Sequence, residues 1–72
     1  MSMSGDKAQA ALLQALLNEG RLDAYRAARR CSGVSAMEAG RALLALVSKG
    51  LAVQVEDGGS NALAAVFAPN NG

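Results

Sequence analysis

Residues 27–38 read AARRCSGVSAME, the most informative segment of the sequence for its fold. It contains the end of one helix, a tight turn with a glycine, and the start of the next helix at Ser35. Ser35 and Glu38 have the spacing of a capping box, in which each side chain accepts a hydrogen bond from the other residue's backbone amide. We therefore predict a helix from Ser35 to about residue 49, ended by Gly50. Its inner stripe is predicted to be Ala39, Leu43, Leu46 and Val47.

Two further helices are expected before this one. Apolar residues recur at i, i+3 and i+4 from about Asp6 to Asn18, which indicates an amphipathic helix with a leucine stripe. After Leu22, Asp23 is expected to cap a short helix that runs from Ala24 to Cys31.

The spacing of the apolar residues changes after Gly50. Leu51, Val53 and Val55 alternate with more polar residues, which predicts a half-buried strand with these three side chains facing the core. Residues 57–61 read DGGSN, a composition typical of a hairpin turn. Residues 62–68 are then expected to form the return strand, ended by Pro69, with Leu22 adding a single-residue strand to the hairpin.

The predicted order of three helices followed by a hairpin defines an α+β fold. We expect a three-helix winged helix-turn-helix with a C-terminal wing of two to three antiparallel strands. The domain is predicted to span residues 6–68, with a disordered N-terminus at 1–5 and a disordered tail at 69–72. A chain of 72 residues holds one domain at most.

Two segments carry a resemblance to a known family. The stretch from Ala27 to Ser35 is similar to the helix-turn-helix of many bacterial winged-helix regulators. The stretch from Arg41 to Leu51 is similar to the third helix of those proteins where it runs into the wing. The resemblance covers nearly the whole chain and implies a DNA-binding role in transcription regulation.

The spacing from Gly20 to Leu51 also resembles that of Zα domains, which bind left-handed Z-form DNA and RNA. The resemblance implies a nucleic-acid contact for Arg41, which matches an arginine of that family. The residues that define Z-form binding are replaced. The family's core Asn falls on Gly40, its stacking Tyr on Leu44, its wing Trp on Ala64, and its wing proline pair on Asn61 and Ala62.

The composition argues against catalysis. The chain has no histidine, and its one cysteine, Cys31, has no evident activating partner and is expected to be a small buried apolar residue. One cysteine and no histidine leave neither a disulfide nor a zinc site, so no metal or cofactor is expected. No apolar run approaches a membrane span, and no signal peptide is evident. We therefore expect an intracellular binding domain that is not an enzyme.

Basic residues gather in the second predicted helix although the net charge is only +1. The second helix of a helix-turn-helix often crosses the phosphate backbone, while the third enters the major groove. We therefore predict a double-stranded nucleic acid as partner, bound more through its backbone than its bases. The predicted contacts are Arg26, Arg29, Arg30, Arg41 and Lys49. Solvated arginines, with Arg21 or Arg26 paired to Asp23, are the alternative interpretation.

A protein partner is the competing hypothesis. Met37 and Leu44 are expected on the outward side of the third helix, where exposed apolar residues favour protein contacts. The near-neutral charge and the acidic turn at Glu56 and Asp57 agree with this alternative. Tyr25 is expected in the core, with a role as a contact residue as the alternative. A homodimer through the first helix or the strand edge is compatible with either role.

Overall fold

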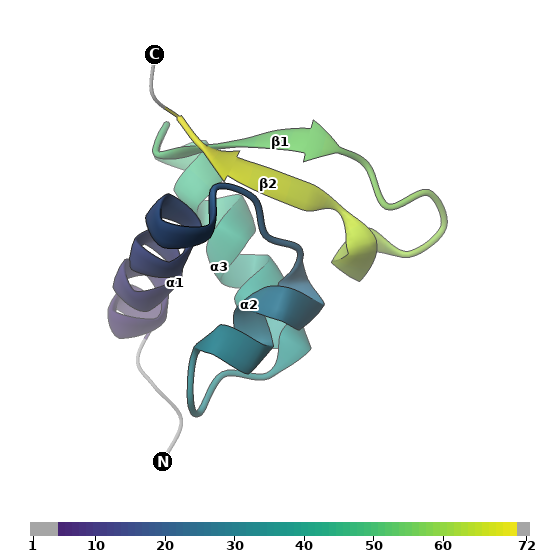
Figure 1. Ribbon diagram of the computed structural model, residues 1–72. Coiled ribbons are helices and arrows are strands. Elements are labelled where there is room, and N and C mark those ends of the chain that lie inside the picture. The colour runs from purple at the N-terminus through teal and green to yellow at the C-terminus, as the bar shows by residue number, and fades with distance from the viewer. Residues whose placement is uncertain (1–4, 71–72) are drawn as a thin grey trace.

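The computed structural model describes residues 5–70 and has three helices followed by an antiparallel hairpin, which confirms the predicted α+β architecture (Figure 1). The expected disorder at residues 1–4 and 71–72 lies outside the described residues. Gly5 begins the first helix and Pro69 ends the last strand, so both belong to the fold. The elements are α1 (Gly5–Glu19), α2 (Ala24–Arg30), α3 (Ala36–Ser48), β1 (Ala52–Glu56), the short 3-10 helix η1 (Ala62–Ala64) and β2 (Val66–Pro69).

The core lies between the three helices and the inner face of the hairpin. It is built from leucine and alanine, and no polar side chain in residues 5–70 is buried. The largest fully buried side chains are Leu12, Leu16, Leu22, Leu43 and Leu46. On α3 the predicted inner stripe is confirmed for Ala39, Leu43 and Leu46, while Val47 packs partly buried at its margin.

The helix boundaries follow the local signals of the sequence. The Ser35 hydroxyl accepts from the Glu38 amide at 3.2 Å, and the Glu38 carboxylate accepts from the Ser35 amide at 3.3 Å, so the capping box is formed. Asp23 caps α2 by accepting from the Arg26 amide at 2.7 Å. Gly33 has φ of +79°, a left-handed conformation that glycine adopts without strain, and this lets the chain turn sharply between α2 and α3.

Removing the cap of α3 should destabilise the domain measurably. We expect Ser35→Ala to lower the free energy of unfolding by about 1 kcal/mol, because the Glu38 amide loses its acceptor. In a domain of this size that loss corresponds to a fall in Tm of about 4–8 °C. Thermal unfolding followed by circular dichroism measures it, with Ser32→Ala as the control at an exposed turn position. Equal Tm values for the two variants would contradict the role of the cap.

The prediction that Leu51, Val53 and Val55 face the core is wrong. Ala52 is 2% exposed and faces the core, whereas Leu51, Val53 and Val55 are 43%, 39% and 40% exposed. The chain stays close to α3 where the helix ends, because the Leu51 amide donates to the Leu46 carbonyl at 2.9 Å. The inward position that follows is occupied by the small side chain of Ala52. Alternation separates the two faces of a strand, but it does not say which face meets the core.

The prediction of a return strand over residues 62–68 is wrong for its first half. Residues 62–64 form η1, which Asn61 caps by accepting from the Leu63 amide at 3.1 Å, and β2 begins at Val66. Pro69 lies within β2, paired with Ala52, instead of ending the strand before it. The register shifts between Gln54 and Glu56, which marks a bulge in β1.

Leu22 pairs with Phe67 on the other side of β2, as predicted. The Leu22 amide donates to the Phe67 carbonyl at 2.9 Å, and the Phe67 amide donates to the Leu22 carbonyl at 2.8 Å. Because both side chains are also buried, this bridge ties the wing to the segment between α1 and α2.

Candidate nucleic-acid interface

Three arginines of α2 lie together on its exposed side. Arg26, Arg29 and Arg30 alone line one shallow depression of about 480 Å³ at the surface. Their spacings of three and four residues place them on one helix face. This arrangement agrees with the prediction from the sequence that the three cations share a surface.

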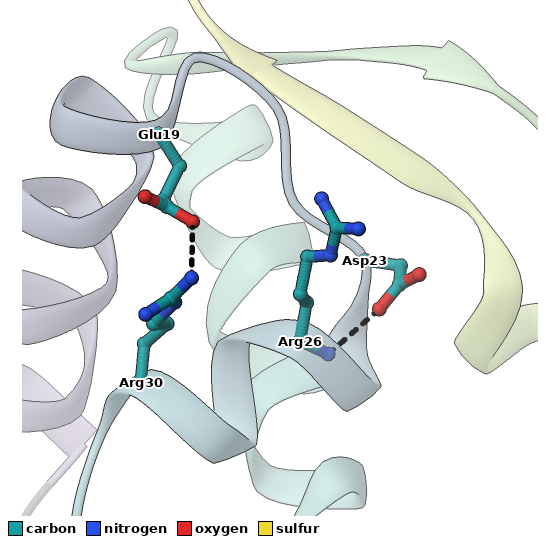
Figure 2. A network of polar contacts seen from close by, with 4 residues as sticks. All are labelled: Glu19, Asp23, Arg26 and Arg30. Atoms are coloured by element: carbon teal, nitrogen blue, oxygen red, sulfur yellow. Dashed lines mark hydrogen bonds and ion pairs between the residues drawn. The ribbon is translucent and has the colours of Figure 1, made fainter.

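The contacts around α2 show which guanidinium groups are already paired (Figure 2). The Arg30 guanidinium forms an ion pair with Glu19 at the end of α1, with Nη2 and Oε1 2.9 Å apart. Asp23 is engaged by the backbone amide of Arg26, not by its guanidinium. Arg21 pairs instead with Glu56 of β1 at 3.9 Å, a long contact between two exposed groups. With the Glu19 carboxylate included, the cluster keeps a net charge of +2.

The outward side of α3 is open to solvent. Met37 is 61% exposed and Leu44 is 54% exposed, as expected, and Arg41 and Ser48 are exposed with them. Glu38 is half-buried because its carboxylate serves the capping box. Helix α3 therefore presents two apolar side chains and one cation toward any partner.

A groove of about 370 Å³ separates this side of α3 from the wing. Met37, Leu44, Leu63 and Phe67 give it apolar walls, and Gly58 and Gly59 of the turn form part of its rim. Two charged residues line it, Arg41 and Asp57, and their charges are opposite. The groove is therefore apolar and close to neutral, in contrast to the depression on α2.

Lys49 lies on a different surface from the arginines. It caps the C-terminus of α3, and its ammonium group donates to the Gln9 side chain of α1. Along the axis of α3, eight residues place Lys49 about 12 Å from Arg41. It lines a separate shallow depression with Asp6, Gln9 and Leu51. The structure thus brings Arg26, Arg29 and Arg30 together and separates Lys49 from them.

Tyr25 is exposed, which corrects the expectation that it belongs to the core. Its side chain is 42% exposed, and its hydroxyl accepts from the Asn61 side-chain amide at 2.9 Å. Tyr25 precedes Arg29 by four residues, so the phenol and this cation share one face of α2. The spacing of Tyr25 and Arg29 could have indicated from the sequence that Tyr25 is a contact residue. The hydrogen bond to Asn61 could not be predicted, because it forms only when the wing packs beside α2.

Cys31 is a buried apolar residue, as expected. It is 7% exposed, and desolvation by burial raises the pKa of its thiol. The thiolate is the nucleophilic form, so this environment disfavours reactivity. Among residues 5–70, no three side chains with the chemistry of metal ligands gather at one place. No helix in that range is long and apolar enough to cross a membrane.

Comparisons of the chain with protein-family models, curated proteins and solved structures find no match.

Proposed function

We propose that this domain binds double-stranded nucleic acid, chiefly through the phosphate backbone. The observation that carries the proposal is the exposed cluster of Arg26, Arg29 and Arg30 on α2. Arginine matches phosphate geometry well, because its planar guanidinium donates several hydrogen bonds in a fixed arrangement. Helix α2 would lie across the backbone while α3 approaches the groove, the docking geometry of helix-turn-helix domains.

Recognition in this mode depends more on shape than on base sequence. Arg41 is the one strong hydrogen-bond donor among the side chains that α3 exposes, and Met37 and Leu44 flank it. Side chains that read adenine by paired hydrogen bonds, Asn and Gln, are absent from α3. We propose that the domain acts as a binding module inside the cell, without catalysis.

The residues by which Zα domains bind left-handed nucleic acid are replaced in this chain, and Gly40 stands where that family has its core Asn. A Cβ built on Gly40 would lie 3.1 Å from Leu63 Cδ2 and 3.7 Å from the Ala24 Cβ. A larger side chain at this position would therefore need the tip of the Leu63 side chain to shift by a few tenths of an ångström. The proposal accordingly concerns right-handed duplexes, and a CG repeat serves as the comparison ligand.

Fluorescence anisotropy with a labelled duplex of DNA or RNA at about 50 mM salt tests the proposal. We expect binding by the wild-type domain and an affinity at least about tenfold lower for the double variant Arg26→Ala with Arg29→Ala, which removes two phosphate contacts. Arg30 is left in place because it also joins α2 to Glu19. Arg21→Ala is the control, compared per charge removed, since it removes one exposed arginine outside α2.

Two outcomes contradict the nucleic-acid role. One is the absence of wild-type binding to every duplex at low salt. The other is a loss of log affinity per arginine removed that is the same in the double variant and in Arg21→Ala, which would assign the effect to net charge and not to the cluster.

A protein-binding role of the groove is the second candidate function. The apolar walls contributed by Met37 and Leu44 favour it, together with the one positive and one negative charge that line the groove. An amphipathic helix with apolar anchors is the ligand chemistry that fits such a surface. A failure of nucleic-acid binding at low salt would favour this role over the first.

A further inference from the structure

Strand β1 lies at the margin of the sheet. The sheet contains β1 and β2, and Leu22 pairs with β2 on the side away from β1. Within residues 5–70, the other edge of β1 therefore has no strand beside it (Figure 1). Such an edge offers backbone N–H and C=O groups to another strand.

The pairing of β2 shows which residues of β1 offer those groups. Phe67 exchanges both backbone hydrogen bonds with Leu22, so its neighbour Ala68 directs its own groups toward β1. Ala68 is the partner of Val53, which therefore uses its N–H and C=O inside the sheet. By alternation, Ala52 and Gln54 direct theirs to the open edge.

The open strand also has an apolar row. Val53 and Val55 are 39% and 40% exposed, and Val53 follows the buried Ala52, so its side chain lies on the sheet face away from the core. An antiparallel sheet normally places polar residues on its solvent face. Lysine and proline, which natural proteins use to block edge pairing, are both absent from β1.

We propose that a second copy of this chain pairs with β1 in antiparallel orientation, about a two-fold axis at Val53. In this register Ala52 lies opposite the partner's Gln54 and Gln54 opposite the partner's Ala52. Each of these two pairs can exchange two main-chain hydrogen bonds. Val53 meets the partner's Val53 at the axis, so the exposed valines of the two copies join on one face.

Charge favours the antiparallel orientation. It places the acidic end of each β1, at Glu56, away from the acidic end of the partner's strand. A parallel arrangement would align the acidic end of one β1 with the acidic end of the other. An axis at Gln54 would require backbone groups of Glu56 at the edge, but the bulge after Gln54 disturbs the strand there.

The interface is small, and the dimer should be correspondingly weak. Standard interfaces bury about 800 Å² on each partner. The whole described surface measures 4430 Å², and one short strand supplies a small part of it. We expect a dissociation constant between about 1 µM and 1 mM, the range of transient complexes. The proposal requires no nucleic acid, so its test is independent of the proposed function.

Analytical ultracentrifugation of the nucleic-acid-free protein, from about 10 µM to about 1 mM, measures this dimer. Val53→Lys should weaken it by about tenfold or more, because two ammonium groups would be opposed at the axis. Leu17→Lys is the matched control, since it places the same charge at an exposed apolar position of α1. Gln54→Pro should also weaken the dimer, because it removes an N–H that the intramolecular sheet does not use.

A monomer at every concentration, or an equal effect of Val53→Lys and Leu17→Lys, would overturn the proposal. The register has its own test in a Cys31→Ala background. Val53→Cys should form a covalent dimer when glutathione disulfide is added, because facing residues at this position have Cα atoms about 4.5 Å apart, within disulfide range. Cross-linking at the same rate in the turn variant Ser60→Cys would contradict the register.

Discussion

Leu43→Ala is expected to lower the free energy of unfolding by about 3 kcal/mol, within the range of 2–5 kcal/mol measured for buried leucines. The Leu43 side chain is fully buried in the middle of α3, where it packs within the core cluster. Its truncation removes apolar contacts and leaves a cavity that neighbouring residues fill only in part. Since a domain of this size has a total stability of about 4–11 kcal/mol, the loss is a large fraction of it.

The neighbouring residue supplies the control. Leu44→Ala makes the same chemical change one position along α3, where the side chain is 54% exposed. We expect it to change the free energy of unfolding by less than about 0.5 kcal/mol. Urea denaturation followed by circular dichroism compares the two variants. Similar midpoints for both would show that α3 does not bury the face assigned to it here.

The helices could be predicted from the sequence because their signals are local. Asp23, Ser35 and Glu38 act within one turn of the chain, and Gly33 turns the backbone regardless of what packs around it. Leucine spacing then fixed the buried stripe of α3, since one helix face is the most apolar. These residues needed no knowledge of distant neighbours.

The wing could not be predicted to the same degree, because its burial depends on tertiary packing. Valine at positions 53 and 55 indicates a strand. Because the chain stays close to α3 where the helix ends, Ala52 faces the core and the two valines are exposed. Tyr25 is exposed and accepts a hydrogen bond from Asn61, which lies thirty-six residues away in the chain. Apolar content alone gives no information on either outcome.

The candidate site shows the same division. The gathering of Arg26, Arg29 and Arg30 follows from helical spacing and could be predicted. The ion pair of Arg30 with Glu19 and the bond of Lys49 to Gln9 could not, because each joins two elements whose packing the sequence does not specify. These contacts lower the free charge of α2 and place Lys49 beside α1.

The second large effect expected is the response of nucleic-acid affinity to salt. Each phosphate contact contributes about −0.9 to the slope of log affinity against log salt concentration, because binding releases condensed cations. Arg26, Arg29, Arg30 and Arg41 as four contacts give a slope of about −3.6. Raising the salt concentration from 50 to 200 mM should then weaken binding by about 150-fold.

The salt dependence of the double variant Arg26→Ala with Arg29→Ala shows whether the α2 arginines contact the phosphates. Two contacts fewer predict a slope of about −1.8, so the same rise in salt should weaken binding by about 12-fold. The Arg21→Ala control should keep the wild-type slope. A double variant whose slope equals that of the wild type would contradict the claim that the α2 arginines hold the phosphate backbone.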